Sequence, residues 1–145
     1  MKKYVLAIAA VALALQGFSS LSKDSYLSIS KKEMNKAVLQ KADKGKIVYT
    51  QTCLACHQAT GAGIPNAFPP LAKSDYLNAD VNRAIKQVIK GSNGPITVNG
   101  KSYKGVMPPQ NLTDQQIADV LTYVYASWGN SKKVITPAMV KAQRK

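Results

Sequence analysis

Two cysteines and a histidine stand together in the segment Cys53-Leu54-Ala55-Cys56-His57. The C-x-x-C-H spacing is typical of haem attachment, because two such thiols can form thioethers with the vinyl groups of one haem and the adjacent histidine can bind its iron. The chain has no other cysteine and no other histidine. The motif therefore predicts one covalently bound haem c, attached at Cys53 and Cys56, with His57 as an axial ligand of the iron.

A C-x-x-C pair can also form a redox dithiol, part of a zinc site or a disulfide, and each of these requires a different structural context. A redox dithiol normally follows a strand in a βαβ unit, and the sequence around Cys53 does not predict one. A four-ligand zinc site needs more cysteine or histidine than the chain has. A disulfide between Cys53 and Cys56 would be strained at this separation. These alternatives stay open beside haem attachment, which is the favoured interpretation.

An iron bound by His57 has a second axial position, to be filled by Met, Lys, an oxygen donor, water or nothing. Met107 is in a predicted loop 50 residues after His57, and the two prolines that follow it stiffen the backbone. Met34 and Met139 are at helical positions, where packing is the expected role. We predict Met107 as the second axial ligand, with loop packing as the alternative. His/Met ligation fills both axial positions and favours electron transfer over catalysis.

The segment 59–72 (ATGAGIPNAFPPLA) is rich in glycine and proline, which predicts an irregular loop. A loop of this length in a compact domain is usually functional or wrapped around something. Ile64, Phe68 and Leu71 would give a haem apolar cover. We also expect a backbone carbonyl of residues 68–71 to accept a hydrogen bond from the second ring nitrogen of His57, which would set the tautomer of this ligand.

The N-terminus has the pattern of an export signal. Lys2 and Lys3 precede an apolar stretch of 12 residues (4–15), and small residues follow, among them Ser20 and Ser22. The stretch suits a signal peptide and is short for a membrane span. We predict a signal peptide over residues 1–22 and a periplasmic location. The alternative is an uncleaved anchor, which would tether the protein to the inner membrane.

The chain is strongly basic, with 20 Lys and Arg against 7 Asp and Glu, a net charge of +13. Loss of the predicted signal leaves 18 basic and 7 acidic residues, or +11. Such a charge favours acidic partners, anionic lipid or nucleic acid. Export argues against nucleic acid, and lysine, which outnumbers arginine here, suits transient steering. Lys73, Lys101 and Lys104 are candidate docking residues for an acidic redox partner, and a basic surface without an assigned partner is the alternative.

Hydrophobic periodicity predicts helices and one short hairpin. Residues 23–40 are expected to form a polar linker (23–30) and a short helix that begins at a capping box over 30–33. A helical segment leads into Cys53, and Gly45 within it indicates either a break or the close approach of another helix. Three further helices are expected over 80–90, over about 114–127 after a capping box at 113–116, and from Thr136-Pro137. An Asn-Gly turn predicts a hairpin over 96–103.

With these residues assembled, the chain resembles class I c-type cytochromes over about residues 41–130. The matching positions are the haem-binding residues Cys53, Cys56, His57 and Met107, the helix-pair residues Gly45, Tyr49 and Tyr123, and Pro69, whose carbonyl meets the axial histidine in that family. The resemblance implies an all-α class I cytochrome c fold, with about four to five helices around one covalently bound haem. Residues 131–145 would then be a C-terminal tail with a short helix.

The strings GIPNAFPPLAKSDYL, GPITVNGKSYKGVMPP and SWGN are similar to those of cytochrome domains fused to or associated with bacterial copper nitrite reductases. Similar strings occur in cytochrome subunits of membrane-bound alcohol dehydrogenases. The resemblance implies an electron carrier rather than an enzyme, which passes one electron to or from a respiratory enzyme such as a nitrite reductase. The alternatives are a subunit of an alcohol dehydrogenase-type complex, and a haem sensor or enzyme with an open iron position.

Overall fold

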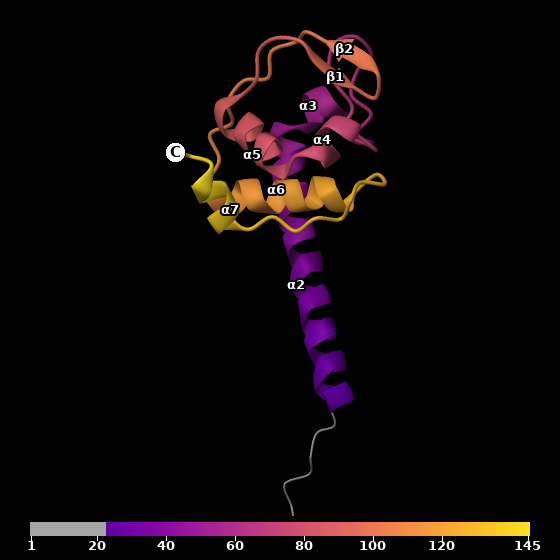
Figure 1. The fold of residues 1–145 in the computed structure, drawn as a ribbon, viewed down its shortest axis with the longest axis vertical. Coiled ribbons are helices and arrows are strands. Elements are labelled where there is room, and N and C mark those ends of the chain that lie inside the picture. Colours follow the sequence, from indigo (N-terminus) through magenta and orange to yellow (C-terminus); the bar gives the residue numbers. More distant parts are fainter. Residues whose placement is uncertain (1–22) are drawn as a thin grey trace, which may run out of the picture. The chain divides into compact units, whose positions relative to one another are not determined.

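The computed structural model describes residues 23–145, which form helices and one small hairpin (Figure 1). The elements are α2 (Lys23–Thr52), α3 (Leu54–His57), α4 (Asp75–Ala79), α5 (Val81–Lys90), β1 (Ile96–Val98), β2 (Lys101–Tyr103), α6 (Asp114–Ala126) and α7 (Pro137–Ala142). The predicted fold class is confirmed. The described part has six helices rather than four to five, because α3 and α4 are too short to show a hydrophobic period. The predicted signal peptide lies outside the described residues.

Helix α2 replaces the linker and short helix predicted for residues 23–40. The structure has one helix from Lys23 to Thr52, so the prediction of a polar linker over 23–30 is wrong. The segment 23–44 contains neither glycine nor proline, and nothing in it interrupts the backbone hydrogen bonds of a helix. The capping pattern over 30–33 is equally compatible with the interior of a helix. The C-terminal part of α2 belongs to a compact unit that comprises residues 36–145.

Gly45 lies where α6 crosses the C-terminal part of α2 (Figure 1). A Cβ atom at Gly45 would be 2.0 Å from the carbonyl oxygen of Asp119 and 2.7 Å from the Cβ of Tyr123. The helix continues through Gly45, so the glycine serves the close approach of two helices and not a break. One turn later the ring centroids of Tyr49 and Tyr123 are 5.5 Å apart. Because α2 ends at Thr52, this crossing determines the position of Cys53.

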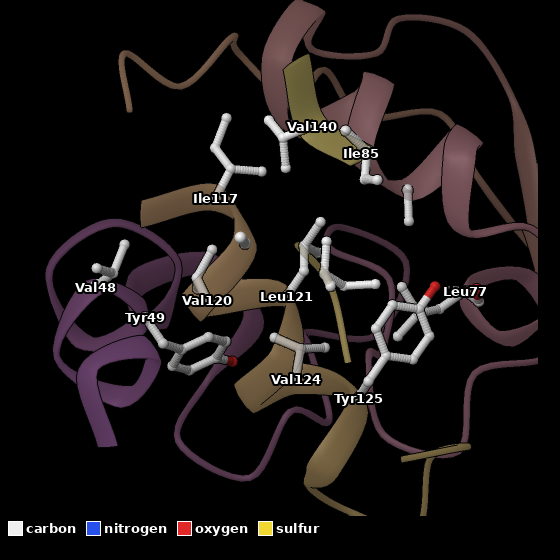
Figure 2. Packing of buried hydrophobic residues seen from close by; sticks show 13 residues of the cluster. Val48, Tyr49, Leu77, Ile85, Ile117, Val120, Leu121, Val124, Tyr125 and Val140 are labelled. Atoms are coloured by element: carbon white, nitrogen blue, oxygen red, sulfur yellow. Dashed lines mark hydrogen bonds between the residues drawn. The ribbon is translucent and has the colours of Figure 1, made fainter. Parts of the chain in front are cut away.

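The hydrophobic core is built around α6, whose apolar side chains meet those of α2 and α5 (Figure 2). The last residues of the chain pack into the same core, since Ile135 and Val140 are fully buried. Arg144 forms an ion pair with Asp114 at the start of α6. The segment 131–145, predicted as a tail beyond a domain of residues 41–130, is therefore an integral part of the compact unit.

The predicted caps and turns are confirmed at the elements around the core. The Thr113 hydroxyl accepts a hydrogen bond from the backbone N–H of Gln116, and the Gln116 side chain accepts one from the N–H of Thr113. Strands β1 and β2 pair antiparallel, and Asn99 and Gly100 between them both have positive φ, 51° and 76°, as a tight Asn-Gly turn requires. Among residues 23–145, no helix is both long enough and apolar enough to cross a bilayer.

Tyr125 allows a test of the core that combines stability and pH. Its buried hydroxyl donates a hydrogen bond of 2.9 Å to the carbonyl oxygen of Leu77, and burial raises the pKa of Tyr125 from 10.0 to about 12. We expect Tyr125→Phe to lower the free energy of unfolding by about 1–2 kcal/mol at pH 7, because the Leu77 carbonyl loses its partner. Urea unfolding at several pH values would measure the difference.

The difference in the free energy of unfolding between the wild type and Tyr125→Phe should shrink between pH 10 and about pH 12. In this range the hydroxyl of Tyr125 stays protonated in the folded protein but ionises in the unfolded chain, so the unfolded wild type is stabilised and the unfolded variant is not. A difference that stays constant up to pH 11.5 would contradict this account of Tyr125.

Candidate functional site

A cavity lies among α3, the loop 59–72, α5, the hairpin, the loop around Met107, and α6. Its empty space is about 1250 Å³ including the open solvent at its mouth. Cys53, Cys56, His57 and Met107 all line it. The structure therefore brings the four predicted haem-binding residues to one place.

Cys53 and Cys56 are placed by the short helix α3, which follows α2 after a single residue. Backbone hydrogen bonds of 3.2 Å and 2.9 Å join the N–H groups of Cys56 and His57 to the carbonyl of Cys53. One helical turn thus sets the two thiols and the imidazole at the same wall of the cavity. Both thiols are free, and burial raises the pKa of the Cys53 thiol. The strained disulfide considered from the sequence is not formed here.

His57 is oriented by a hydrogen bond between its Nδ1 atom and the carbonyl oxygen of Pro69, at 3.0 Å. A carbonyl oxygen can only accept, so Nδ1 carries the hydrogen and Nε2 is the ring nitrogen with a free lone pair. Burial lowers the pKa of His57, and the bond to Pro69 partly opposes this shift. The neutral imidazole with a free Nε2 is the form that binds a metal. The expected acceptor in residues 68–71 is thus found at Pro69.

Tyr49 anchors the residue that follows His57. Its hydroxyl donates a hydrogen bond of 2.7 Å to the carbonyl oxygen of Gln58, where φ is 63° and the chain leaves α3. Burial raises the pKa of Tyr49 far above its ordinary value of 10.0, so the hydroxyl remains a donor at any pH at which the fold is used. The ring of Trp128 packs against that of Tyr49, with centroids 5.2 Å apart. Tyr49 and Trp128 therefore stabilise the position of α3 relative to α2.

Met107 is held in place through its backbone. Its N–H and its carbonyl oxygen form two hydrogen bonds of 2.9 Å with Ser92. A Cβ atom at Gly91 would lie 2.4 Å from the carbonyl oxygen of Met107, so only glycine allows this approach. Beyond the two prolines, the N–H of Gln110 donates to the carbonyl of Val88 on α5 at 2.9 Å. The loop predicted to be rigid is thus pinned on both sides of Met107.

Phe68, Pro69 and Leu71 line the cavity, as expected for the covering loop, but Ile64 does not. The side chain of Ile64 is 38% exposed. Gly63 has a φ of 66°, and its α-carbon lies so close to the carbonyls of Phe68 and Pro69 that a Cβ atom would be 2.3 Å from the nearer oxygen. The loop folds back on itself here, which leaves residues 68–71 and not Ile64 beside the cavity. The predicted role of Ile64 in covering a haem stays a prediction.

Several residues that line the cavity were not predicted from the sequence. Val98 and Tyr103 come from the hairpin, and Val88 and Leu121 come from the apolar stripes of α5 and α6. The alternation of the hairpin and the helical period of the stripes could have indicated these residues. Tyr76, whose ring lies 3.7 Å from the guanidinium carbon of Arg83, comes from α4 and had no such signal.

These residues fit the cofactor that the motif predicts. Two free thiols, one unoccupied imidazole nitrogen and one thioether line a cavity whose other walls are largely aliphatic and aromatic side chains. Thiols at C-x-x-C spacing can attach a haem covalently, whereas the nitrogen of His57 and the thioether of Met107 can bind its iron. The apolar side chains that line the cavity can pack against the porphyrin ring.

Comparison with known proteins agrees with this site. The family model "Cytochrome c" matches residues 42–128. The chain is similar to cytochrome c-552 of Thermus thermophilus, at 38% identity over an alignment that covers 74% of this chain and 86% of that protein. It is also similar to the cytochrome c subunit of the quinone alcohol dehydrogenase of Gluconobacter oxydans, at 28% identity, and to that of the gluconate 2-dehydrogenase of Pantoea cypripedii, at 33% identity.

The alignments cover different fractions of these relatives. The alignments with the two dehydrogenase subunits cover 66% and 70% of this chain but only 21% and 24% of the subunits. The family match, by contrast, spans well over half of the chain, and the cytochrome c-552 match spans most of both proteins. The chain therefore belongs to the cytochrome c family, and it is an electron carrier with covalently bound haem c rather than an enzyme.

Proposed function

We propose that this protein carries one electron on a haem c that is attached through Cys53 and Cys56 and bound axially by His57 and Met107. The observation that supports this most directly is the meeting of all four side chains at one cavity, with the Nδ1 atom of His57 engaged by Pro69. Bound haem supplies an iron that alternates between the ferrous and ferric states.

The protein residues provide positioning and exclusion of water. Pro69 holds the imidazole of His57 in the tautomer that leaves Nε2 free, and this bond also makes the ring more basic. The Ser92 contacts fix the loop of Met107, so the thioether needs no reordering when the charge of the site changes. The apolar wall formed by Leu71, Val88 and Leu121 keeps water from the centre of the cavity. With His57 and Met107 both bound to the iron, no position at the iron would remain for a substrate.

Mass spectrometry of the holoprotein tests the attachment. A proteolytic peptide that contains residues 53–57 should carry the mass of one haem and should keep it after denaturation. Cys53→Ala should leave a single thioether, and the double replacement of Cys53 and Cys56 should leave none. Haem that is released from the wild type by acid and organic solvent would contradict the proposal.

We further propose a periplasmic location and a respiratory oxidoreductase as partner. The export pattern over residues 1–22 supports the location. The likeness of three sequence strings to cytochromes that serve copper nitrite reductases supports a nitrite reductase as partner. The second candidate is a dehydrogenase complex, which is favoured by the similarity to the cytochrome subunits of an alcohol and a gluconate dehydrogenase. Electron transfer measured with each purified enzyme would decide, since only a true partner should show saturable rates.

The basic residues near the cavity predict a salt-dependent rate. Lys73 and Lys104 are exposed and adjoin cavity residues in sequence, and Lys101 is exposed on the hairpin. We expect reduction of the protein by ferrocyanide, a small anion, to slow several-fold between 10 mM and 200 mM salt, because screening weakens steering. Replacement of all three lysines by glutamate should slow the reaction at low salt and abolish this dependence.

Stopped-flow absorbance would measure these rates. The triple replacement of Lys36, Lys44 and Lys46 by glutamate is the matched control, because these lysines are exposed on α2, outside the cavity loops, and give the same total charge change. A wild-type rate that is flat between the two salt concentrations would rule out steering by these lysines.

A further inference from the structure

Asn130 joins three parts of the fold. Its side chain is only 7% exposed. The Nδ2 atom donates hydrogen bonds of 2.9 Å to the carbonyl oxygens of Leu71 and Val124, and the Oδ1 atom accepts one of 3.1 Å from the amide of Asn78. Both donor hydrogens and the acceptor of the amide are therefore used, which leaves this side chain a single orientation.

The bond to Leu71 reaches the segment that holds His57. Leu71 follows Pro69 and Pro70, and the carbonyl of Pro69 accepts the hydrogen bond from Nδ1 of His57. The two rings fix φ at both prolines, and a residue that precedes a proline is restricted in ψ as well. The carbonyl of Pro69 therefore cannot turn independently of Leu71.

Leu71 is also fixed through its backbone N–H. The N–H of Leu71 donates a hydrogen bond of 2.7 Å to the carbonyl of Gly61. With its N–H bound to Gly61 and its carbonyl bound to Asn130, Leu71 is held from both sides. Residues 69–71 thus form a stiff connection of three residues between the amide of Asn130 and the imidazole of His57.

We propose that Asn130 is a positioning residue for the axial ligand His57, which it holds through Leu71 and the carbonyl of Pro69. The inference rests on the proposed role of His57 as an iron ligand. A well-aligned bond from Nδ1 makes the imidazole more basic, and a more basic ligand favours the ferric state. Loss of the Asn130 anchor therefore weakens the bond at Nδ1 and shifts the reduction equilibrium toward the ferrous state.

A purely structural role for Asn130 predicts a different result. Such a role would cost stability and would leave the ring of His57 unchanged. Tyr125→Phe provides the matched control, because Tyr125 is also a buried residue that donates to a backbone carbonyl, that of Leu77 in α4. It removes a buried hydrogen bond without touching residues 69–71.

The test uses Asn130→Leu in the full-length holoprotein. Leucine keeps the approximate size and branching of the side chain and adds no charge, but it removes both donor hydrogens. Because His57 is the only histidine of the chain, labelling with 15N-histidine gives one ring to observe by NMR. In the reduced protein, we expect the Nδ1 proton of the variant to exchange with solvent about tenfold faster than that of the wild type.

Redox titration supplies the second readout. We expect the reduction equilibrium of Asn130→Leu to shift about threefold to tenfold toward the ferrous state, where tenfold corresponds to about 59 mV for one electron. Tyr125→Phe should change neither the exchange rate nor the potential, although urea unfolding should show that it is less stable than the wild type.

An Asn130→Leu protein that is destabilised but keeps the wild-type exchange rate and potential would overturn the proposal. If this variant does not accumulate as folded holoprotein, Asn130→Ser replaces it, because the smaller side chain leaves room for water at both carbonyls, and the same two readouts decide. The wild-type spectrum separates this outcome from failure of the proposed function. A wild-type ring whose Nε2 is not bound to iron would contradict the ligand assignment itself.

Discussion

Replacement of Met107 by alanine is expected to open the sixth coordination position of the iron and to lower the reduction potential by on the order of 0.1–0.3 V, since axial ligands tune haem potentials over about 0.8 V. A thioether favours ferrous iron, so its loss stabilises the ferric form. The oxidised variant should lack the methionine-to-iron charge-transfer band of the wild type. The reduced variant should bind carbon monoxide rapidly. Visible spectra and a redox titration would measure all three changes.

Met139 and Met34 provide matched controls for this experiment. Met139 lies in α7 against the core, and Met34 on α2 is 64% exposed. Neither lines the cavity, so alanine at either position should leave the charge-transfer band and the potential unchanged. If Met107→Ala keeps the band, Met107 is not the ligand, and the rigid loop has only a packing role.

Alanine at Gly45 is expected to destabilise the fold by about 3 kcal/mol, at the upper end of the range for overpacked sites. The added Cβ atom would lie 2.0 Å from the carbonyl oxygen of Asp119, a backbone atom that can move only with α6. Intrinsic helix propensity points the other way and would favour alanine over glycine by about 1 kcal/mol. The sign of the effect therefore tells whether the helix crossing or the local propensity dominates, and denaturant unfolding would measure it.

Ile47→Ala is the control for this substitution. Ile47 lies on the same helix two residues later and is 60% exposed. Its truncation should change the free energy of unfolding by about 0.5 kcal/mol or less, as is usual for surface positions. A Gly45→Ala protein as stable as the wild type would mean that α2 and α6 can separate without cost, and it would refute the role of this crossing in placing Cys53.

The residues of the site were predictable where chemistry depends on local spacing. The C-x-x-C-H motif lies on one helical turn, so the sequence separation of Cys53, Cys56 and His57 already determines that they share a wall. Met107 was identifiable because the prolines after it limit the backbone. The capping box at Thr113 and the turn at Asn99-Gly100 are likewise local signals, and both elements form as predicted.

Contacts that join distant segments were not predictable in the same way. Ile64 and Leu71 look equally suited to cover a haem, and the close approach of Gly63 to the carbonyl of Phe68 separates their positions relative to the cavity. Asn130 meets Leu71 across 59 residues of chain, and its type alone says nothing of this partner. The length of α2 was missed for another reason, because a capping pattern does not exclude a helix that has already begun.

The most direct test of this account is a visible spectrum of the purified protein in its oxidised and reduced forms, combined with a redox titration and with a spectrum in alkaline pyridine. We expect one haem c per chain, a methionine-to-iron charge-transfer band in the oxidised form, no reaction of the reduced form with carbon monoxide, and a one-electron transition. Absence of covalent haem, or a ferrous form that binds carbon monoxide rapidly, would contradict it.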